Sequence, residues 1–345
     1  MKLCIFIMTV LFAVTCAFAE KDVMLGKMKN VRSVKLEKPM QPRFVTEVDG
    51  NFAAIDRKTN SIILFSPEGK ILWSYAKEGK GPGEFSPAIM LSGFYNNRLY
   101  VVDNMLNKIS FFNYDAKKKS FDFVDEYLVN DGRIAAPMFI SPSGKYFIPL
   151  STGKYQIAEM NAQGEVVRSY FPTKEFNPQN ATPEDMMKAM QETSYGMAGN
   201  DTYIMRANIL NNNLQFLKFV GKELKEIKKT KLIHLSKDTY DEENTQSGEQ
   251  RQLRIAAKGV LTFHFMNNYF YVMGYTPDAA KESVVEMYSP EGEYKGYYLL
   301  ENSDTERIGS VFFRKDGSII YQKQVLNADK KMTPDDTMLY FATLN

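Results

Sequence analysis

The sequence has few of the residues that most often form small reactive sites: two cysteines, two histidines and one tryptophan among 345 residues. Both cysteines, Cys4 and Cys16, lie in the first 19 residues, so a chain that loses this segment has no disulfide and no reactive thiol. His234 and His264 are far apart and have no neighbouring histidine or cysteine, which argues against a zinc site. The sequence also lacks Gly-x-Ser-x-Gly, the pattern typical of an activated serine nucleophile.

A strong charge of either sign is absent too. The formal net charge is +2, so we expect neither nucleic acid nor an anionic surface as a partner. After the first 19 residues no apolar segment approaches the roughly 20 residues needed to cross a bilayer, so we expect no transmembrane span. Aromatic residues are abundant, with 24 Phe and 20 Tyr, which is typical of strands that pack face to face.

Residues 1–19 are predicted to be a signal peptide. A lysine precedes an apolar run, and the Ala-Phe-Ala at 17–19 suits signal peptidase, with cleavage before Glu20. The Ala-Val-Thr-Cys at 13–16 offers a second site, where cleavage before Cys16 would leave a cysteine for a lipid anchor. The small residues favour the first site. We therefore expect an exported protein, periplasmic or in the cell envelope, with anchoring through Cys16 as the alternative.

Strand-like runs separated by Gly, Pro, Asn and Asp turns follow in six groups. The groups cover residues 43–75, 89–129, 137–171, 195–232, 260–300 and 308–343. The last group has three runs where the others have four, and residues 31–36 have the length of a strand. We predict that 31–36 pairs with 337–343 and closes a ring. The predicted fold is an all-β, six-bladed β-propeller of four-stranded antiparallel blades, a single domain over residues 20–345.

One blade carries a resemblance to a known family. Gly-Pro-Gly-Glu-Phe at 81–85, the strand at 99–103 with its closing aspartate, and Asn-Lys-Ile-Ser-Phe-Phe at 107–112 resemble an NHL-type propeller repeat. The whole chain after the leader resembles the exported six-bladed propeller proteins of Bacteroidetes, many of them lipoproteins of unassigned function. The resemblance implies a fold and an envelope address but no activity, because propellers host lyases, lactonases and binding modules alike. The 79–85 segment itself is interpreted as a turn rather than a phosphate loop.

The predicted turns divide the two faces of the propeller. Short hairpin turns all fall on one face, which we call the hairpin face. The long connections fall on the other, which we call the long-loop face, at 76–88, 172–192, 234–259, 277–282 and 326–336. Long loops on a rigid scaffold usually form the binding side. Exposed-looking cations and amides there are candidates to hold a carboxylate or sulfate. These candidates are Lys80, Arg133, Arg206, Asn208, Arg251 and Arg254.

The residues favour a binding or interaction module without a catalytic group or cofactor, whose partner or small ligand is unknown. The alternative is a metal-dependent hydrolase or lyase of the lactonase-like propeller type, with carboxylates in the central channel. Asp56 and Asp103 occupy equivalent strand ends and, with Glu286, would have to converge for that chemistry. The simpler interpretation is that each aspartate caps a turn by accepting hydrogen bonds from nearby backbone amides.

Overall fold

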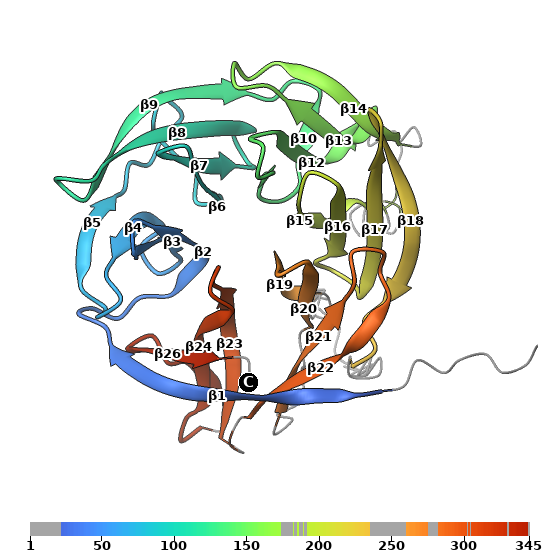
Figure 1. Ribbon diagram of the computed structural model, residues 1–345. Coiled ribbons are helices and arrows are strands. Elements are labelled where there is room, and N and C mark those ends of the chain that lie inside the picture. Colours follow the sequence, from blue (N-terminus) through green and yellow to red (C-terminus); the bar gives the residue numbers. More distant parts are fainter. Residues whose placement is uncertain are drawn as a thin grey trace, which may run out of the picture.

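The computed structural model describes residues 22–173, 182, 185, 189, 192–234, 260–274, 282–301, 303, 305–329 and 331–343. Its strands form six blades arranged in a ring around a central axis (Figure 1). This confirms the predicted all-β, six-bladed propeller. The tight turns between strands use residues that accept a positive φ, among them Asn96 and Asn97 between two strands of the second blade.

Blades 1 to 3 each follow the predicted antiparallel order. Blade 1 contains β2 (Pro42–Val48), β3 (Asn51–Asp56), β4 (Ser61–Phe65) and β5 (Ile71–Tyr75). Blade 2 contains β6 (Ile89–Tyr95), β7 (Arg98–Asp103), β8 (Lys108–Asp115) and β9 (Ser120–Leu128). Blade 3 contains β10 (Gly132–Ile134), β11 (Phe139–Ile140), β12 (Tyr146–Gly153), β13 (Tyr155–Met160) and β14 (Val166–Pro172). Its innermost position is shared, because β10 and β11 both pair with β12.

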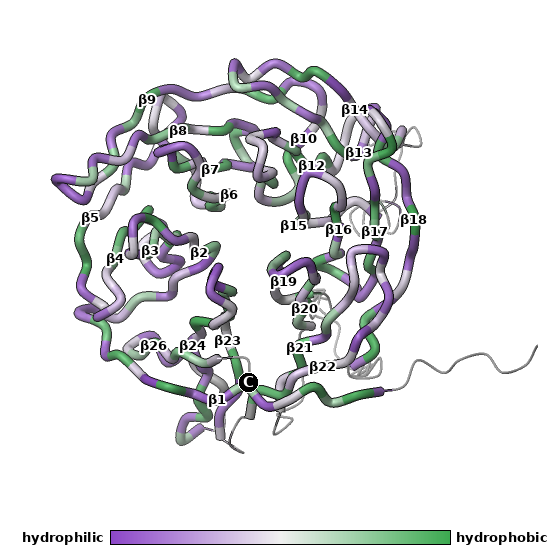
Figure 2. The backbone as a smooth tube through the Cα atoms, in the orientation of Figure 1, coloured by the Kyte–Doolittle hydropathy of each residue, from purple (hydrophilic) through white to green (hydrophobic). Residues whose placement is uncertain are grey.

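Blades 4 to 6 complete the ring. Blade 4 contains β15 (Tyr195–Gly199), β16 (Tyr203–Asn208), β17 (Asn213–Val220) and β18 (Glu223–Lys231). Blade 5 contains β19 (Val260–Met266), β20 (Tyr269–Gly274), β21 (Glu282–Tyr288) and β22 (Tyr294–Glu301). Blade 6 contains β23 (Glu306–Phe313), β24 (Ser318–Leu326), β25 (Met332–Pro334) and β26 (Met338–Thr343). The lysine-rich outer strand β18 is mostly hydrophilic (Figure 2), which discourages pairing with another chain.

The N-terminal strand closes the ring, as predicted, and reaches further than predicted. In β1 (Met24–Lys35), Arg32 pairs with Phe341 and Lys35 with Met338, in antiparallel register with β26. The first half of the same strand pairs in parallel with β22 of blade 5, where Met28 lies opposite Leu300. Figure 1 shows β1 running along the rim past both blades. One strand therefore ties together the two blades at the C-terminal end of the chain.

The hydrophobic core lies between the blades. Among the described residues, six clusters of buried apolar side chains follow one another around the ring, one at each interface between neighbouring blades. The middle strands β3 and β4 are buried along their whole length, because both of their faces pack against other side chains. Each blade thus depends on two neighbours, which makes a rigid frame for the loops at either face.

The glycine-rich link between blades 1 and 2 is structural, as interpreted from the sequence. Phe85 is buried in the cluster between the two blades, where its ring lies 6.1 Å from that of Phe112. The buried Lys108 ammonium donates to the Gly81 carbonyl at 3.0 Å and to a Glu126 carboxylate oxygen at 2.8 Å. Gly83 has φ +70° and its Cβ position would lie 2.9 Å from the Tyr75 hydroxyl, so this turn requires glycine.

Candidate functional site

The strand-end residues Asp56, Asp103 and Asn208 brace turns. Asp56 Oδ1 accepts hydrogen bonds from the backbone amides of Gln41 and Lys58, at 2.8 and 3.1 Å. Asn208 Oδ1 accepts from the amides of residues 210 and 211 in the same way. These side chains are buried at equivalent places in blades 1, 2 and 4. The repeat therefore encodes a turn cap.

Asp103 has the fullest set of partners. Its two carboxylate oxygens accept from the Ser86 amide and hydroxyl at 2.7 Å each, and from the amides of Met105 and Leu106 at 3.1 and 2.9 Å. A carboxylate with this many donors is a poor metal ligand, since its lone pairs are already used. The simpler interpretation of the two aspartates is the one that the hydrogen bonds support.

Glu286 lies in a different network, away from these turns. Its Oε1 accepts from the backbone amides of Ile233 and His234 at 2.8 and 2.6 Å, and its Oε2 accepts from the Tyr288 hydroxyl. Within the part of the chain that the structure describes, no three His, Cys, Asp or Glu side chains are close enough together to hold a metal ion. The convergence of Asp56, Asp103 and Glu286 that the hydrolase alternative required is not found.

His234 connects this network to the start of the chain. Its Nδ1 lies 3.2 Å from Glu286 Oε1, and its Nε2 lies 3.1 Å from a carboxylate oxygen of Asp22. The hydrogen bond to Glu286 raises the pKa of His234, with a smaller contribution from Asp22, against the opposing effect of burial. The Tyr294 hydroxyl also donates to Asp22, at 3.0 Å. The sequence analysis missed this network, because its members lie far apart along the chain.

Arg206 does not lie exposed on the long-loop face, as its assignment from the sequence assumed. Its side chain is 1% exposed and lies on β16, where the next residues on the same face of the strand, Ile204 and Asn208, are also buried. Burial lowers the pKa of Arg206 to about 10, so the guanidinium still carries its charge at neutral pH. The alternation of a strand explains the placement, because Arg206 shares the face that packs against blade 3.

Among the described residues, four side chains contact the Arg206 guanidinium through hydrogen bonds or ring faces. Nη1 donates to the side-chain carbonyl oxygens of Gln156 and Gln215, at 2.8 and 3.0 Å. The Arg206 Cζ lies 4.3 Å from the centre of the Tyr195 ring and 5.9 Å from that of Phe171. These residues belong to β13, β17, β15 and β14, so the site is built by blades 3 and 4 together. Single glutamines within strands gave no signal that would have found it from the sequence.

Two of the other predicted cations, Lys80 and Arg133, are described and lie in other parts of the ring. Lys80 is exposed in the link between blades 1 and 2, and Arg133 is exposed on β10, where its Nη2 donates to the Met105 carbonyl at 3.3 Å. Arg251 and Arg254 lie outside the described residues. The described members of the predicted set thus lie at several different places in the ring.

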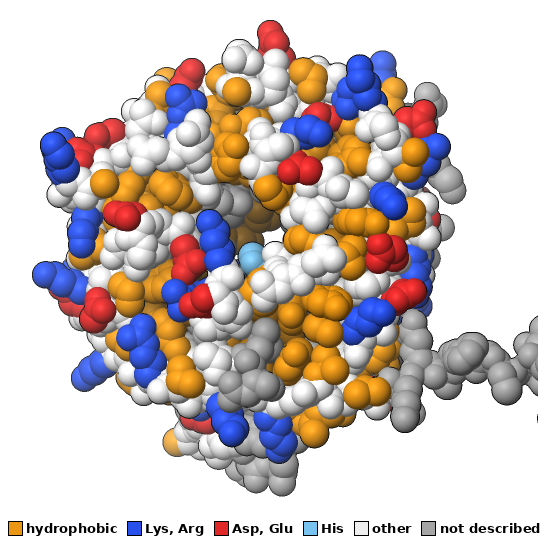
Figure 3. Space-filling model, in the orientation of Figure 1, with side chains coloured by type: hydrophobic (Ala, Val, Ile, Leu, Met, Phe, Trp, Pro, Cys, Tyr) orange, Lys and Arg blue, Asp and Glu red, His pale blue; other side chains and the backbone are white. Residues whose placement is uncertain are grey.

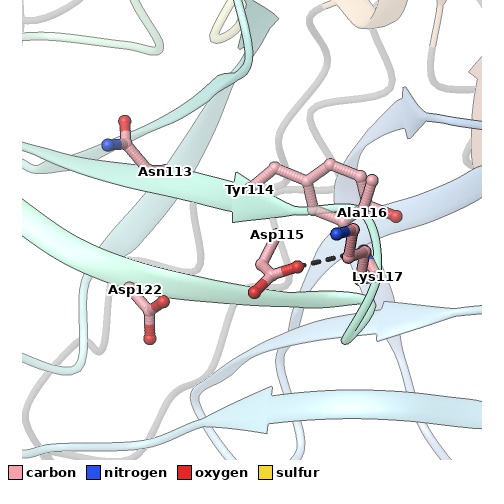
Figure 4. A pocket seen from close by; sticks show the side chains of 6 residues that line it. All are labelled: Asn113, Tyr114, Asp115, Ala116, Lys117 and Asp122. Carbon is pink, nitrogen blue, oxygen red and sulfur yellow. Dashed lines mark hydrogen bonds between the residues drawn. The ribbon is translucent and has the colours of Figure 1, made fainter.

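Two surface depressions lie on the hairpin face. One, of about 460 Å³, is lined by the β8–β9 hairpin and its flanks. Figure 4 shows Asp115 turned toward Lys117 in this hairpin, whose amides at Lys117 and Lys118 donate to the carboxylate at 3.0 and 3.1 Å. A second, of about 340 Å³, lies between the turns of blades 5 and 6. In the first depression the Asp115 carboxylate already accepts the hydrogen bonds that close the hairpin turn, so it is less available to a ligand.

The centre of the disc is hollowed, and charged side chains of both signs are interspersed around it (Figure 3). His264 lies on the inner strand β19, with its ring stacked on Phe313 of β23 at 5.9 Å. Burial lowers the pKa of His264 to about 4, so the imidazole is neutral at physiological pH. Trp73 packs against Phe121 in the cluster between blades 1 and 2, with the ring centres 5.2 Å apart.

The architecture agrees with a family of known fold. A family model described as a 6-bladed beta-propeller, DUF5128, matches residues 38–273, more than half of the chain. The chain belongs to this family. The match establishes the six blades but says nothing of the NHL type, which stays a prediction. No curated protein matches the sequence.

Solved structures of bacterial propellers share the fold of this family member. This chain is similar to a protein of Bacteroides fragilis that is named as exported. The two share 11% identity with a TM-score of 0.56, over 94% of this chain and 100% of that one. A DUF4221 protein of Bacteroides vulgatus has 12% identity and a TM-score of 0.56, covering 92% and 98%.

A PQQ-bound aldose sugar dehydrogenase from Streptomyces coelicolor has 12% identity and a TM-score of 0.50, covering 92% of this chain and 98% of that one. Identities this low establish a shared fold alone. None of the helices in the described part of the chain has the length and apolar character to cross a membrane.

Proposed function

We propose that this propeller is a binding module that holds a small ligand or a partner protein at its long-loop face, without catalysis. The observation that carries the proposal is the set of hydrogen bonds that the strand-end polar side chains accept. The side chains of Asp56, Asp103 and Asn208 are buried, and their oxygens accept hydrogen bonds from backbone amides of the connections on that face. Connections held in place by such caps are prepared for recognition, because little order has to be acquired on binding.

The hydrolase alternative has no comparable support. Its aspartates already accept several hydrogen bonds each, and Glu286 is engaged by His234 and Tyr288. The similarity to a sugar dehydrogenase concerns the fold, and fold alone does not carry an activity from one propeller to another.

The proposal includes an exported protein made of one propeller domain over residues 20–345 after a signal peptide of residues 1–19. The alternative of a lipid anchor at Cys16 is distinguished by mass spectrometry of the protein from envelope fractions. A chain beginning at Glu20 supports the free form, whereas a diacylglyceryl-modified Cys16 at the N-terminus establishes the anchored one.

The test of binding compares the two faces. The purified protein is screened by thermal shift against organic acids, amino acids and sugars, and by cross-linking in envelope fractions for a protein partner. Lys80→Ala and Arg133→Ala on the long-loop face should weaken any binding found. Glu68→Ala, Lys222→Ala and Glu291→Ala on the hairpin face serve as controls. Binding that is lost only in the hairpin variants would place the site on the other face and refute the proposal.

A further inference from the structure

The interface between blades 3 and 4 contains a buried cation with unused hydrogen-bonding capacity. Arg206 Nη1 has two partners, Gln156 and Gln215, but Nε and Nη2 are buried and have no hydrogen-bond partner in the part of the chain that the structure describes. Buried donors are rarely left unpaired, because each loses its bonds to water without replacement. Such a group in a native fold calls for an explanation, and a bound anion is one.

The unpaired atoms are arranged for a specific kind of anion. In the planar guanidinium, Nε–H and Nη2–H point in parallel from one edge, and this edge matches the two oxygens of a carboxylate. The side-chain oxygens of Gln156 and Gln215 accept from Nη1, so they fix the plane of the guanidinium and leave its Nε–Nη2 edge available to a ligand. Tyr195 covers the face of the guanidinium at 4.3 Å. The orientation of the group is thereby fixed before any ligand arrives.

We propose that the Nε–Nη2 edge of Arg206 binds the carboxylate of a small organic acid between blades 3 and 4. The inference rests on the proposed binding function and names the chemistry of its ligand. A monoanion would balance the single buried positive charge. Sulfate or phosphate is a poorer match, because a second negative charge would be buried here without a partner, and the nearby Glu226 already contributes negative potential.

The position of Arg206 limits the shape of the acid. β16 ends at Asn208, two residues after Arg206. Two residues of strand span about 7 Å, so the carboxylate must reach about 7 Å along the strand from its end. Tyr195 and Phe171 flank the guanidinium there. Phe171 has φ +57°, an uncommon backbone conformation for a bulky residue and one that clusters at functional sites. A narrow acid with an apolar tail fits these walls better than a branched or highly polar one.

The test measures carboxylate binding directly at this arginine. The purified protein, labelled with ¹⁵N at arginine Nε, is titrated with acetate, propionate and butyrate at constant sodium concentration, with chloride and sulfate as competing anions. We expect one Nε–H resonance to shift saturably with the carboxylates and much less with chloride or sulfate. Calorimetry on the same samples gives the affinities. If no arginine resonance shifts saturably with any acid, the edge holds ordered water only and the inference is wrong.

Two variants assign the effect. Arg206→Lys keeps a positive charge but lacks the two parallel donors, so carboxylate affinity should fall at least about tenfold. Arg98→Lys, at an exposed arginine that begins β7 and is not among the candidate binding residues, should bind like the wild type. Unchanged carboxylate affinity in Arg206→Lys would overturn the inference. If Arg206→Lys does not fold, the wild-type titration still decides.

The same samples separate this inference from the proposed function. A ligand from the screen that depends on Lys80 or Arg133 but binds Arg206→Lys normally would leave the binding function standing and refute the carboxylate site. If no ligand or partner is found and the acids leave every resonance in place, both proposals fail.

Discussion

Two buried cations in this propeller are treated in opposite ways. Lys108, between blades 1 and 2, is 1% exposed and bonds to both a carboxylate, Glu126, and the Gly81 carbonyl. Arg206, between blades 3 and 4, is equally buried, but among the described residues its hydrogen-bond partners are two amide oxygens. The first charge is neutralised by Glu126, whereas no described carboxylate forms an ion pair with the second.

This difference separates a structural charge from a functional candidate. Taking a charge out of water is expensive unless it is paired and hydrogen-bonded. Lys108 meets that condition, and its partners hold the glycine-rich link in place. Arg206 meets this condition at Nη1, but its buried Nε and Nη2 have no hydrogen-bond partner among the described residues. A bound ligand could supply the missing hydrogen bonds. Burial alone therefore does not separate a structural charge from a functional one. The number and charge of the hydrogen-bond partners do.

Removing the paired charge should have the largest effect. Lys108→Met leaves the Glu126 carboxylate without its ammonium and the Gly81 carbonyl without its donor, so we expect a loss of about 3 kcal/mol in the free energy of unfolding. Urea denaturation of the purified protein measures it. Lys118→Met is the control, because Lys118 is 73% exposed and its bond to Asp115 should be worth less than about 1 kcal/mol. Equal losses in the two variants would remove one side of the comparison.

Removing the unpaired charge should cost less. Arg206→Met gives up two hydrogen bonds to glutamine, but it also removes a buried cation and two unsatisfied donors. These effects oppose each other, so we expect a change within about 1 kcal/mol, of either sign. The same denaturation experiment compares it with Lys108→Met. A loss as large as that of Lys108→Met would mean that Arg206 is fully compensated in the fold.

Supplying a carboxylate should make Arg206 resemble Lys108. In Gln215→Glu the new carboxylate lies where an amide oxygen now accepts from Nη1 at 3.0 Å, and we expect a gain of about 1 kcal/mol at pH 7. The cation lowers the pKa of the new glutamate in the folded protein. The gain should therefore be complete above the ordinary glutamate pKa of about 4.3 and disappear as the pH falls through the lowered value.

Gln215→Leu serves as the matched control for that gain, because it removes the amide without adding charge. It should destabilise the protein at every pH tested. A Gln215→Glu variant that is no more stable than Gln215→Leu at pH 7 would show that the site does not accept an anion.

The fold could be read from the sequence because each blade repeats one local pattern. Turn residues such as Asn96 and Asn97, and strand-end residues such as Asp103, act within their own blade, so spacing alone reveals them. The ring closure followed from a missing strand. The parallel half of β1 was missed, because pairing with β22 depends on a partner about 270 residues away and leaves no local signature.

The candidate site was harder to predict because burial depends on the neighbouring blade. The sequence predicts Arg206 to be an exposed loop cation, yet it is buried two residues inside β16 on the face toward blade 3. Its partners Gln156 and Gln215 come from two blades. Sequence patterns give the face of a strand but not which side chains meet across an interface, and at Arg206 that meeting decides the chemistry.

His234 offers a third cation for the comparison, partly exposed and placed between two carboxylates. The pKa of His234 is raised in the folded protein, chiefly by the hydrogen bond to Glu286, so its folded value lies above its unfolded value of about 6.5. Its stabilisation should be fully present below that unfolded value and lost as the pH rises through the folded one. Because the side chain is 20% exposed and Asp22 is 55% exposed, the effect should be the smallest of the four, below about 1 kcal/mol. Melting temperatures from pH 5.5 to 8.5 for the wild type and His234→Gln measure it, and the difference between them should shrink toward pH 8.5. A difference that is constant across this range would mean that the charge of His234 adds nothing to the hold on the N-terminal strand, and that pairing alone keeps β1 in place.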